Sequence, residues 1–478
     1  MFSLLSAFIV FSIFPSAISL KIAIIGGGIG GASSAYFLRA LAPSETNIEI
    51  RLFNQGNIGG RLTTVEMQYN GKKRMFEAGG SVLHPANLYF KNWMEKFGLH
   101  KNKPHKRGIM GIWNGQEFVF LKSSWYLITF YRLLKRYGFD QLKSHFEIRS
   151  LLSDFENIYA MLDQGRSFDT ADAMVMAMST HLSKLVNMTM EENLADSGYH
   201  YPFITEFANA ALNCNYGQSV KEIRAFAGFV GLSGSVSGLY SVNGSNKIIV
   251  EKLIDYSKVK LIKAEVTSIS KWNDQFVLYG SDGQELDANY SYVIIAVPLH
   301  QKQQIQIEDV NWESQRGNFK QIIATFVEGS LRATHWSLPK SYMLTAVISC
   351  NNSLSYNSIA QILPVDEEDE GNESLTKADS NKIWKIFSSK NLTDTVLSLY
   401  FSKIRNVKRV SFLAYPEYKK YPADRPKFRV TKNICFVNAV EWLASTIEMS
   451  AIGGRNCVNM LLGDLELIGI NKTIKTEL

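Results

Sequence analysis

The sequence has few cysteines and, beyond its first residues, no apolar run long enough to span a membrane as a helix. It also lacks internal repeats and low-complexity tracts, which excludes solenoid and fibrous architectures. The cysteines are too few and too scattered for a disulfide framework. Since Cys435 lies in an apolar strand pattern, we expect it to be a buried thiol. The cysteines are Cys214, Cys350, Cys435 and Cys457.

Neither sign of charge dominates, because the net charge is only +7 over 478 residues. The densest basic stretches, residues 101–107 and 419–432, contain prolines and indicate solvated loops. No nucleic-acid-binding motif accompanies them, so we expect no nucleic-acid partner. A hydrophobic fraction of 46% and a charged fraction of 20% are typical of a folded globular protein. The length favours two domains.

The N-terminal residues indicate export. Residues 1–19 are apolar, and the small residues Ala17 and Ser19 suit cleavage of a signal peptide after Ser19. The alternative is a membrane anchor, for which the run is short. Asn-x-Ser/Thr sequons also occur, although chance gives several in a chain of this length. We therefore expect a glycoprotein of the secretory pathway. The sequons begin at Asn187, Asn243, Asn289, Asn351, Asn372, Asn391 and Asn471.

A glycine run follows the first predicted strand, residues 21–25. Gly26, Gly28 and Gly31 have the G-x-G-x-x-G spacing, with Gly30 inside the same run. The first glycine permits a tight turn, the second lets the backbone approach a pyrophosphate, and the third lets a helix pack on the strand. A helix over residues 32–41 then offers unpaired N–H groups to phosphate oxygens. This order predicts a dinucleotide site.

Two features after the second predicted strand, residues 48–53, refine that site. Asn54 stands where an Asp or Glu usually binds the adenosine ribose, so we expect weaker cofactor affinity. Gly59, Gly60 and Arg61 place mobile backbone and a fixed cation where the chain passes the pyrophosphate a second time. A tightly held flavin benefits from such a segment, so it favours FAD over NAD. The alternative is a surface loop that happens to contain an arginine.

The remaining pattern predicts an α/β fold with a discontinuous Rossmann-like FAD-binding domain and an inserted, mixed α+β substrate domain. A hairpin is expected at residues 62–77 around Asn70-Gly71. Residues 90–225 show aromatic and aliphatic side chains at helical spacing. Further strands are predicted at 259–270, 275–279, 293–297 and 434–440, and a helix at 446–462. We assign residues 20–90, 226–300 and 430–468 to the FAD-binding domain, and 91–225 and 301–429 to the substrate domain.

Several segments, in this order and spacing, resemble the prenylcysteine oxidase (prenylcysteine lyase) family, which is related to the flavin amine oxidases. The resemblance implies an FAD-dependent oxidase that cleaves the thioether of farnesyl- or geranylgeranyl-cysteine with O2 and water, during degradation of prenylated proteins. The products would be cysteine, a prenyl aldehyde and H2O2, and the destination a lysosome or secretion. The matching segments are residues 21–31, 58–62, 76–81 with His84, 216–219, 225–228, 241–247, 296–300, 438–442 and the 475–478 tail.

The resemblance also implies roles for individual residues. The backbone of Val266 would contact adenine, and Ile447 would begin a helix whose N-terminus stabilises reduced flavin. Glu77, beside Gly79, would lie close to the cofactor or be a solvated strand-end carboxylate.

Four further positions belong to the same matching segments. Glu441 lies in a matching segment that we expect to bind the cofactor. Gly244 and Lys247 lie in a turn that we expect to approach the flavin. His84 would transfer a proton, or be structural. No metal site is expected.

Other functions stay open at this point. The same scaffold supports amine oxidation, in which aromatic rings surround a cationic amine. A non-catalytic paralogue would bind lipid or lipoprotein, and peripheral membrane or lipoprotein association is compatible with either reading. An NAD dehydrogenase fits least, because of the N-terminal segment and Gly59-Gly60-Arg61. The aromatic-rich insertion suits a long isoprenoid chain, and no obligate protein partner is evident.

Overall fold

The computed structural model of the chain describes residues 19–102, 108–235, 238–300, 305–312, 317–366, 382–419 and 425–467. The predicted signal peptide, apart from Ser19, and the tail at 475–478 lie outside these residues. So do the sequons at Asn372 and Asn471, and parts of both basic stretches. Within the described residues, no helix has the length and apolar character needed to cross a membrane.

Six of the described strands form the sheet that carries the glycine run. Five of its strands are parallel, and only β20 at one edge is antiparallel to its neighbour. The central strands of such a sheet are buried on both faces, which explains apolar runs such as residues 292–295. The order is β20 (Arg429–Thr431), β21 (Ile434–Phe436), β13 (Tyr292–Ile295), β1 (Ser19–Ile25), β2 (Asn47–Phe53) and β9 (Lys260–Ile262).

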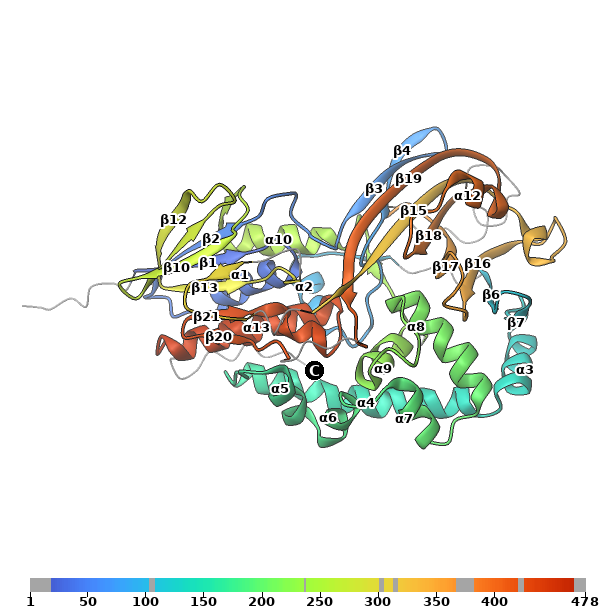
Figure 1. Cartoon of the computed structure of the whole chain (residues 1–478), viewed down its shortest axis with the longest axis horizontal. Coiled ribbons are helices and arrows are strands. Elements are labelled where there is room, and N and C mark those ends of the chain that lie inside the picture. Colours follow the sequence, from blue (N-terminus) through green and yellow to red (C-terminus); the bar gives the residue numbers. More distant parts are fainter. Residues whose placement is uncertain are drawn as a thin grey trace, which may run out of the picture.

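Helix α1 (Ile29–Leu41) packs between α10 (Lys247–Ser257) and α13 (Ile447–Asp464) beside this sheet. Ten successive residues of α1 are buried, because small side chains such as Ala32 and Ser33 let its neighbours approach closely. Segments far apart in sequence therefore build one nucleotide-binding half, seen in Figure 1 on the left. A smaller sheet flanks it: β12 (Glu285–Tyr290), β11 (Gln275–Tyr279), β10 (Ser268–Trp272) and β14 (Gln306–Ile307).

The second half combines a large sheet with a layer of helices below it in Figure 1. Long strands β15 and β19 pair along most of their length and run from the large sheet towards the nucleotide-binding half. The seven described strands of this sheet are β19 (Phe401–Pro416), β15 (Phe319–Leu331), β18 (Ile383–Ser388), β17 (Ser358–Ile362), β16 (Leu344–Ser349), β6 (Ile109–Trp113) and β7 (Phe118–Leu121).

The helices of this half come mainly from one stretch of the chain. They are α3 (Tyr126–Tyr137), α4 (Asp140–Asp163), α5 (Ala171–Met178), α6 (Thr180–Leu185), α7 (Met190–Asp196), the π-helix Phe203–Ala208, α8 (Asn209–Tyr216), α9 (Ala225–Ser233) and, later in the chain, α12 (Asp394–Tyr400). Helix α2 (Leu88–Lys96) instead packs on α10 and α13 of the nucleotide-binding half.

Several predicted elements are confirmed and others are wrong. The hairpin β3 (Thr64–Tyr69) and β4 (Lys72–Glu77) turns at Asn70 and Gly71, both with positive φ. The strand predicted at 434–440 ends at Phe436, and a 3-10 helix, Val437–Trp442, replaces its second part. The strand predicted at 259–270 is two strands in different sheets. Strands β6 and β7 interrupt the region predicted to be helical.

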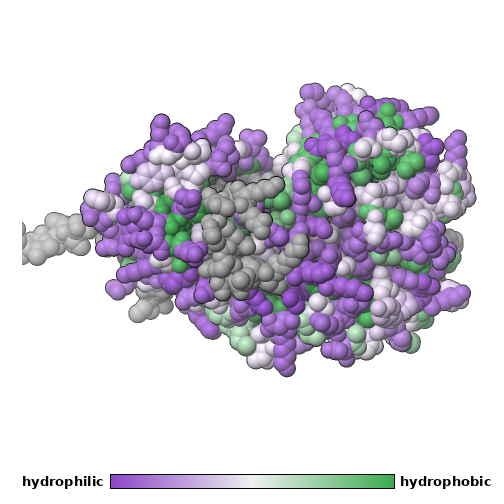
Figure 2. Space-filling view, viewed as in Figure 1, coloured by the Kyte–Doolittle hydropathy of each residue, from purple (hydrophilic) through white to green (hydrophobic). Residues whose placement is uncertain are grey.

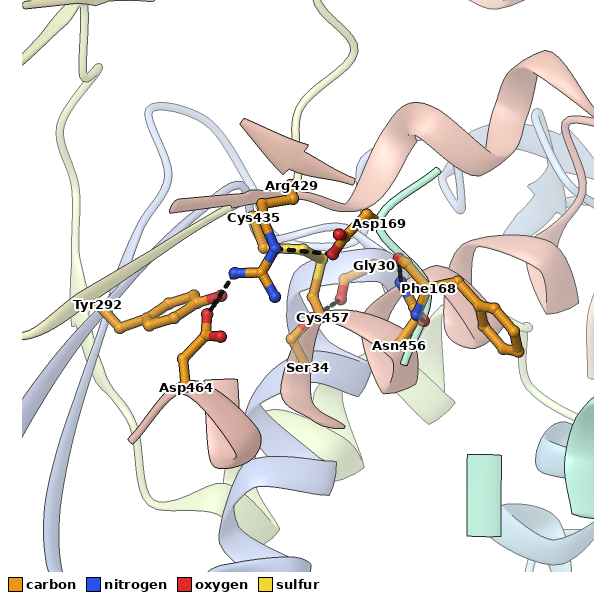
Figure 3. The surroundings of a disulfide bond; sticks show 10 residues. All are labelled: Gly30, Ser34, Phe168, Asp169, Tyr292, Arg429, Cys435, Asn456, Cys457 and Asp464. Carbon is orange, nitrogen blue, oxygen red and sulfur yellow. Dashed lines mark hydrogen bonds and ion pairs between the residues drawn. A yellow bond between two sulfur atoms is a disulfide. The ribbon is translucent and has the colours of Figure 1, made fainter. Parts of the chain in front are cut away.

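The prediction that Cys435 is a buried thiol is wrong. Cys435 in β21 forms a disulfide with Cys457 in α13, which links the sheet to the helix packed on it (Figure 3). Beside the disulfide, Arg429 pairs with Asp169 and Asp464, so the inserted helices and the end of α13 meet at one cation. A strand cysteine and a helix cysteine 22 residues apart carry no spacing motif, so the sequence did not indicate this bond.

Candidate active site

A cavity of about 710 Å³ lies where the two halves meet. One wall, the glycine wall, consists of the loops around Gly26–Gly30, Gly59–Arg61 and Gly79–Ser81 and the start of α13. A second wall, the apolar wall, consists of side chains from helices α4, α6 and α9. Its residues are Ile148, Leu151, Leu152, Phe155, Leu182, Leu185, Phe226, Phe229 and Val230.

The glycine wall is so tightly packed that several of its positions have no room for a side chain. A Cβ on Gly31 would lie 1.9 Å from the carbonyl oxygen of Gly26, so α1 can cross the loop only with glycine at this position. Gly26 has a φ of +112° and donates its N–H to the Phe53 oxygen at 2.8 Å. Gly26, Gly28 and Gly30 line the cavity, while Gly31 lies behind them and makes the close packing possible. The tight turn at Gly26 and the close packing at Gly31 are as the spacing predicts.

The second glycine segment lies directly against the first. The Gly59 N–H donates to the Gly27 oxygen at 2.8 Å, and Gly28 and Gly59 form a parallel bridge. Both Gly59 and Gly60 have positive φ and line the cavity. The backbone therefore passes the start of α1 twice, as expected for two approaches to one pyrophosphate.

Asn54 lines the cavity and holds the glycine loop in place. Its Oδ1 accepts the Gly27 N–H at 3.0 Å, and its Nδ2 donates to the Gly56 oxygen at 2.7 Å. A carboxylate could accept the first hydrogen bond but could not donate the second. The amide at this position therefore has a structural reason that the sequence alone did not reveal.

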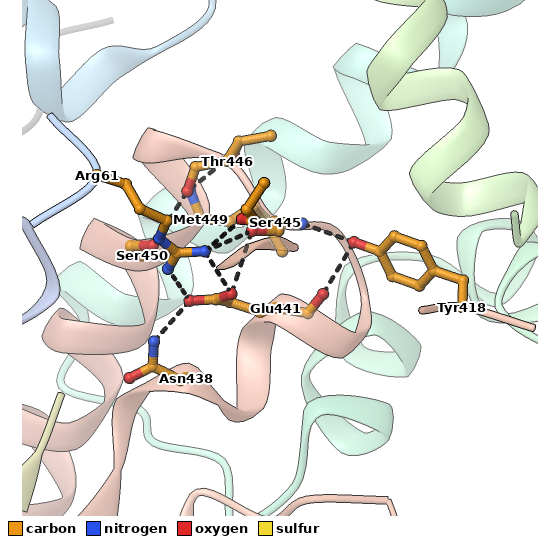
Figure 4. Close-up of polar contacts among 9 residues, drawn as sticks. Arg61, Tyr418, Asn438, Glu441, Ser445, Thr446, Met449 and Ser450 are labelled. Atoms are coloured by element: carbon orange, nitrogen blue, oxygen red, sulfur yellow. Dashed lines mark hydrogen bonds and ion pairs between the residues drawn. The ribbon is translucent and has the colours of Figure 1, made fainter. Parts of the chain in front are cut away.

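Arg61, predicted as a fixed cation at the pyrophosphate, is held in place by a buried ion pair. Its guanidinium forms a two-pronged ion pair with Glu441, including Nη1 to Oε2 at 2.9 Å, and also donates to the Ala414 oxygen at 2.6 Å (Figure 4). Glu441 is completely buried and accepts further hydrogen bonds from Asn438 and Ser445. Arg61 still lines the cavity, but its charge is neutralised, and the pair ties the glycine wall to β19 and the 3-10 helix.

Other predicted cofactor residues lie close to the wall or behind it. Gly79 lines the cavity, and a Cβ there would lie 1.8 Å from the Arg61 oxygen. Glu77 does not line it; one carboxylate oxygen accepts the Asn246 N–H at 2.7 Å, and burial raises the pKa of Glu77. Val266 is buried in the connection between β9 and β10 and is likewise not a lining residue.

The turn predicted to approach the flavin also lies behind the wall. Neither Gly244 nor Lys247 lines the cavity. The Gly244 N–H donates to the Val365 oxygen, while the Lys247 stem packs near Gly59 and its ammonium pairs with Glu251. The turn therefore supports the glycine wall from behind.

Helix α13 begins at the cavity, and Ile447 is one of the lining residues. The Thr446 side chain caps the helix by accepting the Met449 N–H at 3.1 Å. Glu448, the next lining residue, is buried and accepts the Tyr89 N–H and the Tyr159 hydroxyl, both at 2.8 Å. Burial raises the pKa of Glu448 to about 7. The sequence did not single out Glu448, because its partners Tyr89 and Tyr159 come from α2 and α4.

His84 lines the cavity in a defined orientation. Its Nδ1 accepts the Ala86 N–H at 3.1 Å, so a neutral ring carries its proton on Nε2. Within the described residues, that Nε2 is buried with no hydrogen-bond partner, and burial lowers the pKa of His84. The ring therefore offers a hydrogen-bond donor. The proton-transfer role stays a prediction.

The apolar wall places one face of α4 against the cavity. Ile148, Leu151, Leu152 and Phe155 follow the i, i+3, i+4, i+7 spacing of a single helical face. Tyr216 and Tyr415 close the cavity nearby with rings 5.2 Å apart. A surface of this kind binds a long apolar chain through contact area.

A family model described as "Prenylcysteine lyase" matches residues 120–466, and an "NAD(P)-binding Rossmann-like domain" model matches residues 24–97. Prenylcysteine oxidase 1 of Homo sapiens is 34% identical, over 96% of this chain and 93% of the relative. The Bos taurus protein of that name is 32% identical, over 92% and 88%. Prenylcysteine oxidase 1-like of Homo sapiens is 27% identical, over 96% and 94%.

Two solved structures have a similar fold. Putrescine oxidase with bound putrescine aligns with a TM-score of 0.56 and 12% identity, over 94% of this chain and all of that one. Cyclohexylamine oxidase from Brevibacterium oxydans aligns with the same TM-score and 13% identity, over 94% and 99%. At this identity the likeness concerns the fold, a Rossmann-like nucleotide-binding half with an added sheet and helices.

Proposed function

The chain belongs to the prenylcysteine lyase family, and from that premise we propose that it is an FAD-dependent oxidase that cleaves the thioether of prenyl-cysteines. One observation carries the proposal: a single cavity is lined on one side by crossed glycine loops and on the other by apolar helix faces. The first suits a dinucleotide, and the second suits a farnesyl or geranylgeranyl chain.

The residues present fit a flavin dinucleotide. The backbone is accessible to a pyrophosphate at Gly26, Gly28 and Gly30, near the start of α1, and at Gly59 and Gly60. Gly31 has no room for a Cβ, which keeps α1 close to this loop. Ile447 and the capped N-terminus of α13 would face the flavin ring, where the helix dipole stabilises negative charge. When bound, a flavin supplies a two-electron acceptor that molecular oxygen can reoxidise.

The proposed reaction balances as R–CH2–S–R′ + H2O + O2 → R–CHO + R′–SH + H2O2. The carbon that is oxidised is both allylic and bonded to sulfur, so positive charge that develops there as hydride leaves is stabilised twice. Water adds to that carbon, and the resulting hemithioacetal breaks its C–S bond to release the thiol and the aldehyde. The protein need only orient the substrate and admit one water.

The side chains that line the cavity suit these two tasks, orienting the substrate and admitting one water. The α4 and α9 faces hold the apolar chain and exclude bulk water from it. The Nε2 hydrogen of His84 would donate a hydrogen bond to a polar substrate atom or to water. Glu448, whose pKa lies at about 7, would hold a proton at the cavity wall near neutral pH.

Three assays test the function together. Purified holoprotein mixed with farnesylcysteine in air should release cysteine, farnesal and peroxide in equal amounts. The cofactor released on denaturation should have the mass of FAD. Putrescine and benzylamine, offered in parallel, should release no peroxide. Peroxide from the amines and none from farnesylcysteine would assign the cavity to amine oxidation.

The proposal also places the protein in the secretory pathway, with the lysosome as destination. The apolar N-terminus, the sequons and the buried Cys435–Cys457 disulfide are all expected of an exported chain. Cell fractionation of the tagged protein should recover it with lysosomal markers. Treatment with a glycosidase specific for N-linked glycans should then shift its mobility on a gel. Recovery in cytosol without a mobility shift would contradict this placement.

A further inference from the structure

The surface of α3 and the start of α4 expose large apolar side chains. Trp125, Tyr126 and Leu127 are consecutive and remain 70%, 80% and 76% exposed. We call the whole group the α3 patch; its other members are Ile128, Phe130, Tyr131, Phe139, Leu142 and Phe146, each at least 42% exposed. Contiguous apolar surfaces of this kind mark binding sites, whereas single exposed apolar residues are ordinary.

The face of the molecule in Figure 2 shows the ordinary arrangement, with hydrophobic side chains in small groups between hydrophilic ones. The α3 patch is not a loosely attached segment either. Tyr137 at the end of α3 is buried and packs edge-on against Phe203 and Phe207. Arg132 donates to the Leu121 oxygen at 2.6 Å, which fastens the middle of the helix to β7. The exposed rings are therefore held outwards by an anchored helix.

The charges around the patch identify the kind of partner. Residues 122–150 contain six Lys or Arg residues, of which Arg136 pairs with Glu206, and only two acidic ones, Asp140 and Glu147. Asp140 is buried beside His200, and Glu147 accepts the Tyr199 hydroxyl, so neither presents a free negative surface. Exposed aromatic rings bordered by cations are typical of a helix lying in an anionic lipid interface. A second copy of the chain would bring two basic patches together, which like-charge repulsion disfavours.

The α3 patch and the cavity lie on opposite sides of helix α4. Phe146 in the patch and Phe155 in the apolar wall are nine residues apart on α4, which places them about 180° apart around the helix. Leu142 shares the outer face, and Leu151 and Leu152 share the inner one. Helix α4 is thus the wall between the α3 patch and the cavity.

We propose that the α3 patch docks the protein on an anionic phospholipid bilayer. This inference rests on the proposed function only for its purpose, since a prenyl-cysteine partitions into lipid. Docking through α3 brings the inserted helices, and with them the apolar wall, to the surface where the substrate is concentrated.

Flotation of the holoprotein with vesicles tests the docking. Phosphatidylcholine vesicles that contain phosphatidylserine should carry the wild type, and pure phosphatidylcholine vesicles should carry much less. The double variant Trp125→Glu/Leu127→Glu should lose binding roughly tenfold or more, because two large apolar groups are replaced by charges. The matched control is Trp272→Glu/Leu399→Glu, which changes side chains 71% and 50% exposed away from the patch and should bind as wild type.

The outcomes separate docking from catalysis. Both double variants should keep their flavin and turn over detergent-dispersed farnesylcysteine like the wild type, and only the patch variant should turn over vesicle-borne substrate more slowly. Equal vesicle binding by all three proteins, or by none, would overturn the proposal. A dimer that only the Trp125→Glu/Leu127→Glu variant loses, without vesicle binding, would overturn it too. Absence of any turnover would contradict the proposed function and leave the flotation result standing.

Discussion

The two walls of the cavity are made in different ways. The glycine wall consists of backbone, with hydrogen bonds between loops and no room for a Cβ at Gly31 or Gly79. The apolar wall consists of side chains on the faces of α4, α6 and α9. The first depends on fixed geometry and tolerates almost no change, whereas the second depends on contact area and tolerates change in proportion to the area lost.

The largest effect is expected from adding one methyl group to the glycine wall. Gly31→Ala puts a Cβ 1.9 Å from the Gly26 oxygen, so the loop must open or α1 must shift. We expect purified protein without flavin, or no folded protein at all. The control is Gly56→Ala in the neighbouring loop, where nothing lies within 4 Å of the added atom. Full flavin content in Gly31→Ala, read from absorbance, would show that the wall is not rigid.

A smaller effect is expected behind the glycine wall. Glu441→Gln removes the buried partner of Arg61 and should lower the free energy of unfolding by about 3 kcal/mol. Asp366→Asn breaks the solvent-exposed pair with Arg74 and should cost less than about 1 kcal/mol. Urea unfolding of both variants makes the comparison. Equal losses would mean that the Arg61–Glu441 pair contributes no more than a surface ion pair.

Glu448 lies where the two walls join, and its effect should depend on pH. Burial raises its folded-state pKa to about 7, so the folded protein binds a proton that the unfolded chain releases at lower pH. Stability should therefore fall by up to about 3 kcal/mol as pH rises from about 5 to about 8. Glu448→Gln should remove this fall, while Glu66→Gln on the exposed hairpin should keep it. Identical pH profiles for wild type and Glu448→Gln would contradict the burial argument.

The smallest effect is expected in the apolar wall. Leu152→Ala removes contact area for an isoprenoid but no hydrogen bond, so kcat/KM for farnesylcysteine should fall roughly tenfold with flavin content unchanged. Leu399→Ala on the surface of α12 should leave both quantities as in the wild type. A loss of flavin in Leu152→Ala would mean that the two walls are not separable.

The same difference between the walls explains which parts of the site the sequence could predict. The glycine loops, their strands and the helix after Thr446 are local patterns. Residues 26–31 were identified by their spacing, and residues 59–60 and 446–462 by their composition and their position after a predicted strand. For the apolar wall, the sequence predicted only a region rich in aromatic and aliphatic side chains at helical spacing. Side chains on α4 and α9 become neighbours through tertiary packing, which no local pattern indicates. The turn that replaces the end of the strand predicted at 434–440 was missed, since buried apolar residues suit a strand and a 3-10 helix equally well.

Contacts between distant residues were out of reach for the same reason. Arg61 and Glu441 are 380 positions apart, and neither segment indicates that the other will neutralise it. The sequence predicted only a weakened ribose contact at Asn54. The hydrogen bond from Asn54 to Gly56 depends on the loop conformation, which the sequence did not indicate. The Cys435–Cys457 bond required knowing that α13 crosses β21.

In the proposed function, one cavity brings an oxidising flavin and a prenyl thioether together. Anaerobic mixing of the purified holoprotein with farnesylcysteine tests it most directly, with the absorbance of oxidised flavin followed over time. We expect the flavin to bleach with farnesylcysteine, to stay oxidised with putrescine, and to regain its colour with release of peroxide when oxygen is admitted. Flavin that stays oxidised with farnesylcysteine, or bleaches with the amine instead, would contradict it.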